Sequence, residues 1–243
     1  MFSSTPTSFE DIDFLDEIEV PFYKIASMDL DNPFLLSYVA ETKKPIILST
    51  GMGTLAETEK ALSIISRAGN DNVIILHCTS QYPTPPENAN LLAIETLANA
   101  FGHPVGFSDH TKGNIISQAA VARGACLIEK HFTLDRTMPG PDQTLSGEPA
   151  EFKDLVNSIR CIEAALGSGI KEPTEAEMDM RNGMRRSIVT NDAIASGTVI
   201  TLEMLDFKRP GTGISPAEVD WVVGRVAKED IAADSIIERG FLI

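Results

Sequence analysis

The feature that most constrains the fold is a strand, helix, strand pattern that places a histidine after each of two neighbouring strands. An apolar run at 104–107 ends in Ser108-Asp109-His110-Thr111, and a helical pattern then ends at Gly124. A second apolar run, 126–128, leads into Glu129-Lys130-His131. This is a βα unit of a parallel sheet. Because the carboxyl ends of parallel strands share one edge, we expect His110 and His131 to lie together where such sheets and barrels carry their sites.

Two neutral imidazoles at one sheet edge, with Asp142 on the following loop, suit a divalent metal that keeps open coordination positions. A single histidine is more often a hydrogen-bonding residue of the structure, and we interpret His77 and His103 in that way. Two histidines at matched strand ends with acidic neighbours favour the metal instead.

A strand followed by a helix recurs about every 25 residues up to residue 170. Helix starts are predicted at Ser8, Asn32 and Thr54, and a long amphipathic helix closes at Gly167. Six such units are counted when the run at 2–6 is taken as a strand end. A TIM-type (β/α)8 barrel needs eight, so we expect a barrel lacking about its first two βα units, in an N-terminally truncated sequence.

The residue pattern changes after the last of these βα units. We expect a partial TIM barrel over 1–170, a charged, Met-rich linker over 171–185, and a small all-β module over 186–243. The module is predicted from short β-prone pieces separated by turns, which read SIVT, TVIT, LDFKRP and RVAKEDI.

Composition limits the functions open to this chain. Its 243 residues carry a net charge of −15, which argues against nucleic acid and anionic membranes as partners. No apolar run is long enough for a membrane span, and the N-terminus does not read as a signal peptide. The three cysteines, Cys78, Cys126 and Cys161, are scattered among apolar segments. They are interpreted as reduced, buried residues of a cytoplasmic protein.

Hydroxyl side chains recur where the predicted strands stop. Together with Lys24 they predict a ring of neutral donors and one positive charge, which suits a ligand carrying a phosphate and a carboxylate. Any one such residue is more often structural, and the recurrence carries the prediction. The hydroxyls are those of Thr5, Ser27, Ser49, Thr50, Thr79, Ser80 and Ser108.

Several collinear blocks make the chain recognisable. YKIAS, KPIILSTGM, HCTSQYPTP, SDHT, EKHFTLD, MPGPDQTLSGEP, RRSIV and KRPGTGISP resemble, in this order, the sialic acid synthase family, which comprises N-acetylneuraminate synthase and its bacterial nonulosonate relatives. In that family the C-terminal module is the antifreeze-like (SAF) domain, and the run at 2–6 is the third barrel strand.

The resemblance implies condensation of phosphoenolpyruvate with an N-acylated hexosamine, such as N-acetylmannosamine, to give a nine-carbon nonulosonic acid and phosphate. It implies that His110 and His131 bind Mn²⁺ or Mg²⁺ and, with Lys24 and Asp142, have catalytic roles. Phosphoenolpyruvate contacts are implied for Thr5, Lys24, Ser27, Ser49, Ser80 and Ser108, and sugar contacts for Tyr82, Asp142 and Asp29. Ser80, Asp29 and Gln143 depart from the residues common in neuraminate members, which leaves the sugar open.

The resemblance and the linker also imply a domain-swapped homodimer, in which Arg209 of one subunit reaches the sugar in its partner's barrel. Two alternatives stay open. One is another phosphoenolpyruvate-dependent 2-keto acid synthase, against which the β-module argues. The other is a non-catalytic fragment or sugar-binding remnant of such a synthase, because two strands are expected to be missing and this chain alone is expected to have negligible activity.

Overall fold

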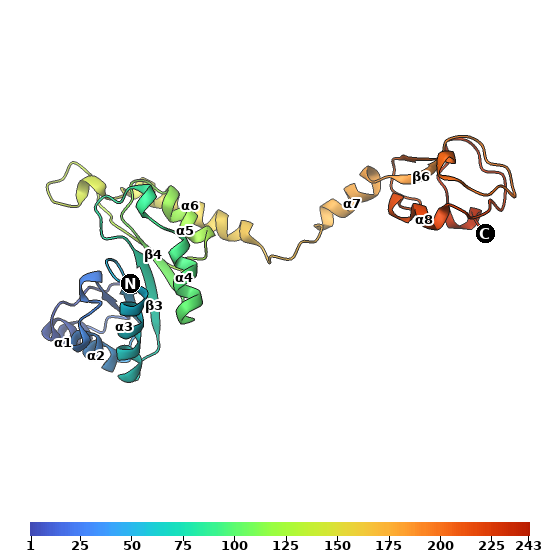
Figure 1. The fold of residues 1–243 in the computed structure, drawn as a ribbon. Coiled ribbons are helices and arrows are strands. Elements are labelled where there is room, and N and C mark those ends of the chain that lie inside the picture. The colour runs from blue at the N-terminus through green and yellow to red at the C-terminus, as the bar shows by residue number, and fades with distance from the viewer. The chain divides into compact units, whose positions relative to one another are not determined.

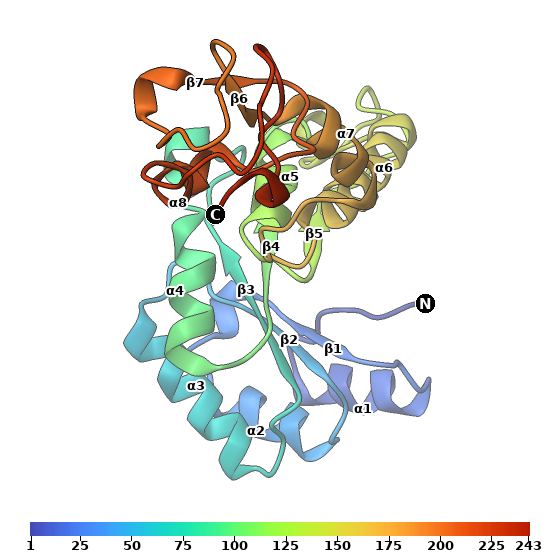
Figure 2. The same cartoon turned by 90° about the vertical axis from the view of Figure 1, so that its right-hand side faces the viewer.

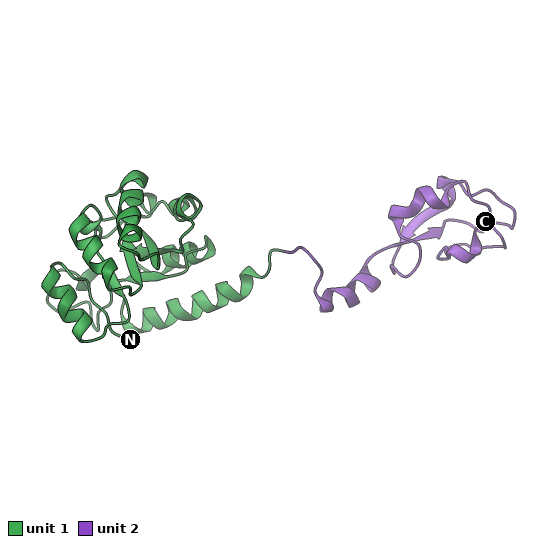
Figure 3. Cartoon of the chain, turned by 90° about the horizontal axis from the view of Figure 1, so that it is seen from below, with its two compact units in different colours: residues 1–169 green, residues 170–243 purple.

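The computed structural model describes all residues, 1–243, in two compact units, Met1–Gly169 and Ile170–Ile243 (Figure 1, Figure 3). Each unit has its own cluster of buried apolar side chains. No helix is both long enough and apolar enough to span a bilayer.

Unit 1 is built on one parallel sheet of five strands. Helices alternate with the strands, and α2, α3 and α4 lie along one side of the sheet (Figure 2). The strand order is β1-β2-β3-β4-β5, so each strand pairs with the next one in the chain. The strands are β1 (Tyr23–Ile25), β2 (Ile46–Ser49), β3 (Val73–Cys78), β4 (Val105–Asp109) and β5 (Ile128–Lys130).

The helices of unit 1 begin and end largely where the sequence predicts. Ser8, Asn32 and Thr54 each accept a hydrogen bond from a first-turn backbone N–H group, which confirms the three predicted caps. The long amphipathic helix ends before Gly167, as predicted. The helices are α1 (Phe9–Glu17), α2 (Pro33–Glu41), α3 (Leu55–Arg67), α4 (Leu92–Phe101), α5 (Ile115–Ala122) and α6 (Pro149–Leu166).

Side-chain alternation along the strands separates the core from the site. Tyr23 and Ile25 of β1 are fully buried in the apolar core, whereas Lys24 between them points to the opposite face of the sheet. In the same way Phe107 of β4 joins the core, and its neighbour Ser108 faces the other side. The sheet thus presents an apolar face to the helices and a polar face that carries the candidate site.

Two predictions for unit 1 are corrected. The predicted strand at 2–6 is absent, because residues 1–7 adopt no regular secondary structure. Pro6 has no N–H group to donate to a strand ladder, and Ser3 donates instead to the carbonyl of Phe22. Cys126 and Cys161 are exposed, not buried, and only Cys78 is buried.

Unit 2 contains one antiparallel pair, β6 (Ser187–Thr190) and β7 (Leu205–Lys208). The predicted pieces TVIT and RVAKEDI form only isolated bridges, which are Val199 with Val226, Ala227 with Leu242 and Ile231 with Ile194. The helix α7 (Glu175–Met184) lies within the predicted linker, and the module predicted as all-β over 186–243 also contains the short helix α8 (Val219–Val222). Unit 2 nevertheless has its own core, in which isoleucine side chains predominate.

Candidate active site at the carboxyl edge of the sheet

A pocket of about 350 Å³ lies at the carboxyl ends of the strands of unit 1. Every one of the five strands or the loop that follows it contributes to its lining. The lining includes seven of the predicted site residues, Lys24, Ser27, Ser49, Ser80, Tyr82, Ser108 and His110, together with Glu129 and Cys78. Four of the seven predicted strand-end hydroxyls, those of Ser27, Ser49, Ser80 and Ser108, thus gather at this pocket, whereas Thr5, Thr50 and Thr79 do not line it.

The other predicted site residues lie elsewhere. His131 and Asp142 adjoin the pocket through His110, as described below. Thr5 is exposed in the irregular N-terminal segment, and Asp29 belongs to a short 3-10 helix, Ser27–Asp29, without lining the pocket. Arg209 is exposed on unit 2. The structure thus does not bring Thr5 or Asp29 to this pocket, and Arg209 belongs to the other compact unit.

The hydroxyls on the β1 to β3 side crowd around Gly51. The backbone N–H group of Gly51 donates to the hydroxyl oxygen of Ser27 over 3.0 Å. A Cβ atom at position 51 would collide with the hydroxyl oxygens of Ser27 and Ser80. Glycine is therefore required here, because its bare Cα lets two hydroxyls and a backbone amide converge.

The buried hydroxyl of Ser49 in this pocket lacks a hydrogen-bond partner. Its side chain is only 2% exposed, and its hydroxyl has no partner in the protein. A buried hydroxyl without a partner carries a free-energy cost of about 1–3 kcal/mol. Such groups are uncommon and require an explanation. A polar ligand in the pocket would supply the missing partner.

Glu129 of β5 contacts pocket residues of two other strands, Ser108 of β4 and Lys24 of β1. Glu129 accepts a hydrogen bond from the Ser108 hydroxyl over 2.7 Å, and its second oxygen lies 3.5 Å from the ammonium nitrogen of Lys24. Lys24 also donates to the carbonyl of Ile25. The only cation lining this pocket is therefore paired with a carboxylate.

The two histidines meet as predicted, and an aromatic ring joins them. The ring centroids of His110 and His131 are 5.3 Å apart. The Tyr82 ring lies 4.2 Å from that of His110 and presents an edge to that of His131 at 5.7 Å. Asp142 places a carboxylate oxygen 3.7 Å from Nδ1 of His131. The matched strand ends thus form one cluster of three rings and an acid.

The hydrogen bonds at this cluster define which nitrogen of His110 is free. Nδ1 of His110 lies 2.9 Å from the carbonyl oxygen of Thr79. A carbonyl only accepts, so Nδ1 donates a proton to it, and in the neutral tautomer that makes this bond the lone pair is on Nε2. Histidines that bind metals commonly donate their other ring N–H group to a carbonyl or carboxylate in this way.

Burial and electrostatics keep the second ring neutral near pH 7. Burial lowers the pKa of His131 below its ordinary value, and the neighbouring His110 lowers it further, while Asp142 and Glu129 oppose this shift. Burial also raises the pKa of Tyr82, with Cys78, Glu129 and Asp142 adding to the effect. A neutral imidazole is the form of histidine that binds a divalent cation.

The two histidines fit a metal only as part of its ligand set. No group of three His, Cys, Asp or Glu side chains lies close enough to hold an ion. Two imidazole nitrogens would leave several coordination positions for water and substrate, which is the arrangement of catalytic and not of structural metal sites.

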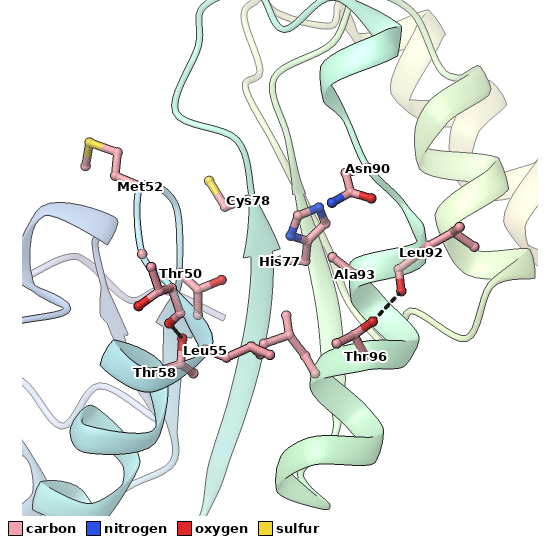
Figure 4. A pocket seen from close by; sticks show the side chains of 13 residues that line it. Thr50, Met52, Leu55, Thr58, His77, Cys78, Asn90, Leu92, Ala93 and Thr96 are labelled. Atoms are coloured by element: carbon pink, nitrogen blue, oxygen red, sulfur yellow. Dashed lines mark hydrogen bonds between the residues drawn. The ribbon is translucent and has the colours of Figure 1, made fainter.

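A second pocket, also of about 350 Å³, lies between α3 and α4 on the helix side of β3 (Figure 4). Its buried polar groups are already satisfied by the backbone. Thr50 donates to the carbonyl of Leu76, Thr58 to that of Thr54, and Nε2 of His77 lies 2.8 Å from that of Ala89. These three side chains of the second pocket thus have hydrogen-bond partners, unlike Ser49 in the first pocket. His77 bonds to the backbone, which agrees with the structural role predicted for it.

Sequence reasoning missed Glu129 and Gly51. Glu129 stands in the quoted EKHFTLD block, two residues before the predicted ligand His131, so strand alternation would have placed both on the same face of the sheet. Gly51 directly follows the strand end at Ser49 and Thr50, where the need for close backbone approach is the usual reason for a glycine.

A curled parallel sheet with polar and histidine side chains at its carboxyl edge defines the class of barrel-type α/β proteins with a site at that edge. The chain belongs to the NeuB family, whose model matches residues 1–171. The SAF domain model matches residues 185–239.

Known relatives agree with this assignment. An uncharacterized protein of Methanocaldococcus jannaschii is 47% identical over 98% of this chain and 70% of its own length. The N,N'-diacetyllegionaminic acid synthase of Campylobacter jejuni is 43% identical over 98% of this chain and 72% of its own length. The crystal structure of the sialic acid synthetase of Leptospira borgpetersenii in complex with citrate is 42% identical, with a TM-score of 0.69, and covers 74% of this chain and 64% of that one.

Proposed function

We propose that this protein acts as a nonulosonic acid synthase, which joins phosphoenolpyruvate to an N-acylated hexosamine and releases phosphate. Family membership and the named activities of the relatives support the reaction class. The observation that carries the proposal is the pocket that gathers Lys24, four serine hydroxyls and His110, in which the buried Ser49 hydroxyl has no protein partner.

The serine and lysine side would bind phosphoenolpyruvate. Hydroxyl and ammonium donors suit its phosphate and carboxylate oxygens, and hydrogen bonds to charged groups contribute about 1.5–3 kcal/mol each. Lys24 would turn from Glu129 toward the ligand, and Ser49 would find its missing partner. The net charge of −15 repels such an anion at long range, so these local donors have to overcome it.

The histidine side would bind the sugar. His110, His131 and Tyr82 form one cluster beside the serine side, and Asp142 is exposed enough to accept hydrogen bonds from sugar hydroxyls. In the reaction, C3 of phosphoenolpyruvate bonds to the aldehyde carbon of the open-chain sugar, and water adds to C2. The bond between C2 and the phosphate oxygen then breaks, and the aldehyde oxygen ends as a hydroxyl.

We further propose that His110 and His131 hold Mn²⁺ or Mg²⁺ through their neutral rings. When bound, such a cation polarises a carbonyl oxygen and so makes its carbon more electrophilic. Mn²⁺ binding to the purified chain, followed by electron paramagnetic resonance, should weaken at least about tenfold in His110→Ala and in His131→Ala. His77→Ala, in the second pocket, is the matched control and should bind Mn²⁺ like the wild type.

The reaction is tested by incubating the protein with phosphoenolpyruvate, N-acetylmannosamine and Mn²⁺ while phosphate and new carbon–carbon bonds are measured. The turnover of this chain alone is expected to be small, and it should give one phosphate per new bond and none when the sugar is omitted. Phosphate release without the sugar contradicts the proposal. A chain that binds both compounds without joining them supports the alternative of a non-catalytic sugar-binding protein.

A further inference from the structure

Two residues that the proposed chemistry does not use form a buried ion pair directly behind the two histidines. Asp109 and Lys130 each precede a histidine in the sequence, and they are direct partners in the register of β4 with β5. The ammonium nitrogen of Lys130 lies 2.8 Å from a carboxylate oxygen of Asp109. Their side chains are only 4% and 0% exposed, so solvent screens this pair little.

Further hydrogen bonds tie the pair to both strand ends. Asp109 also accepts from the Ser117 hydroxyl on α5 and, over 2.8 Å, from the backbone N–H group of Thr111. Lys130 donates to the carbonyl of Thr111, also over 2.8 Å. The backbone at Thr111 is thus held through both its N–H and its C=O group. Since Asp109 precedes and Thr111 follows His110, the hydrogen bonds fix the backbone on both sides of His110.

Strand alternation places the pair on the opposite side of the sheet from the pocket. Ser108 and Glu129 are register partners that bond to one another in the pocket, and Asp109 and Lys130, one position on, face the helices. His110 and His131, one position further, return to the pocket side, where their ring centroids are 5.3 Å apart. The ion pair therefore fastens β4 to β5 at the level that determines the spacing of the two rings.

Stability alone is a weak reason for such a pair. Moving two charges out of water costs several kcal/mol per ion, and apolar side chains of similar volume often replace a buried pair without loss. An apolar pair would pack between β4 and α5, but it could not bond to both backbone groups of Thr111. What the charged pair adds is a defined geometry at the strand ends.

We propose that Asp109 and Lys130 are positioning residues, which hold His110 and His131 at the spacing seen here and thereby keep both rings available to one ligand. The spacing itself follows from the contacts of this chain. Only its consequence, tighter binding of a divalent cation, rests on the proposed function.

The test compares two double variants of the full chain. Asp109→Asn/Lys130→Met removes the pair without leaving an unpaired charge. Asp16→Asn/Lys44→Met removes the same groups from the 2.6 Å ion pair of Lys44 with Asp16, which lies away from the histidines. In both, nuclear Overhauser contacts between the ring protons of His110 and His131 are measured, and amide spectra report folding.

The contacts between the rings should weaken in the first variant and persist in the second. A loosening of the site by about 1 Å, from a centroid distance of 5.3 Å, lowers a signal that depends on the inverse sixth power of distance about threefold. Ring contacts of wild-type strength in Asp109→Asn/Lys130→Met overturn the proposal. If that variant does not fold, Asp109→Asn alone, which keeps an acceptor for the Thr111 N–H group, is judged by the same two outcomes.

Titration with Mn²⁺ separates this inference from the proposed function. The variant with weakened ring contacts should bind Mn²⁺ at least about tenfold more weakly than the wild type. A wild-type chain that shows the ring contacts but binds no Mn²⁺ refutes the metal site and leaves the positioning role standing. Equal Mn²⁺ affinity despite weakened contacts refutes the link between spacing and metal.

Discussion

Lys24 and Glu129 stand on the two edge strands of the sheet, β1 and β5, yet their charged side-chain atoms are 3.5 Å apart. Three strands lie between them. Neighbouring strands are spaced by about 4.8 Å, so in a flat sheet β1 and β5 would be about 19 Å apart. The sheet therefore curls strongly toward its polar face, as part of a barrel does, and the two edges point their charged side chains into one pocket.

The pairing of Lys24 with Glu129 predicts the effect of removing the acid. Glu129→Gln keeps a hydrogen-bond acceptor for Ser108 but removes the negative charge beside the only cation of the pocket. Phosphoenolpyruvate should then bind about two- to fivefold more tightly at low salt, because an opposing charge near 4 Å at a partly solvated site is worth about 1 kcal/mol. Calorimetric titration measures this. Weaker binding would mean that Glu129 orients Lys24 and does not merely neutralise it.

The unpartnered hydroxyl of Ser49 predicts a separation of stability from binding. Ser49→Ala should leave the unfolding free energy unchanged or raise it by about 1 kcal/mol, because a buried group without a partner is removed. The same change should weaken phosphoenolpyruvate binding about tenfold.

Thr50→Val is the matched control for Ser49→Ala. It removes a hydroxyl that is already bonded to the carbonyl of Leu76. This variant should lose about 1 kcal/mol of stability and bind phosphoenolpyruvate normally. Chemical denaturation and calorimetry on both proteins check the pair, and a Ser49→Ala protein that is less stable with unchanged binding speaks against a ligand at this hydroxyl.

The buried His77 predicts part of the pH dependence of stability. Burial lowers the pKa of His77 below its ordinary value of 6.5. The unfolded chain thus binds more protons than the folded one below that pH, and stability should fall as the pH drops from 6.5 toward the lowered value. His131 contributes in the same direction.

His77→Gln isolates this contribution, since its amide can still donate to the carbonyl of Ala89. The loss of unfolding free energy between pH 7 and pH 5 should be smaller in this variant than in the wild type, as measured by urea denaturation at each pH. Equal losses in both proteins would show that His77 does not contribute to the dependence.

Arg209 remains predicted as a sugar contact supplied by a partner subunit. Arg209→Ala should weaken sugar use about ten- to a hundredfold, the loss expected for one charge-assisted hydrogen bond. Mixing Arg209→Ala with His110→Ala under conditions that exchange subunits tests the arrangement. Half of a random mixture is heterodimer with one intact site in two, so about a quarter of the wild-type activity should return. No recovery would rule out the contribution in trans.

The strand ends could be predicted from the sequence because apolar runs end where polar side chains begin. Ser27, Ser49, Ser80, Ser108 and His110 all line the pocket, since parallel strands bring their carboxyl ends to one edge. The contact of Lys24 with Glu129 could not be predicted in this way. It depends on the curl of the whole sheet, which is a property of packing and not of any local pattern.

The register of β4 with β5 and the exposure of two cysteines could not be predicted from the sequence either. Asp109 and Lys130 become partners only because β4 and β5 pair in one register, and a shift by one residue would separate them. Cys126 and Cys161 sit among apolar neighbours and are nevertheless exposed, because local hydrophobicity does not say which side of a helix or strand is covered. In unit 2, the β-prone pieces TVIT and RVAKEDI form isolated bridges in place of the predicted strands.

The central claim is that the serine and lysine side of the pocket binds phosphoenolpyruvate. The most direct measurement is a calorimetric titration of the 243-residue chain with phosphoenolpyruvate, in the wild type, Lys24→Ala and Lys43→Ala. Lys43 is an exposed lysine that bonds to backbone carbonyls away from the pocket, and it serves as the control. The account predicts saturable binding that Lys43→Ala leaves unchanged and Lys24→Ala weakens at least about tenfold. No saturable binding by the wild type, or equal affinity in all three proteins, would contradict it.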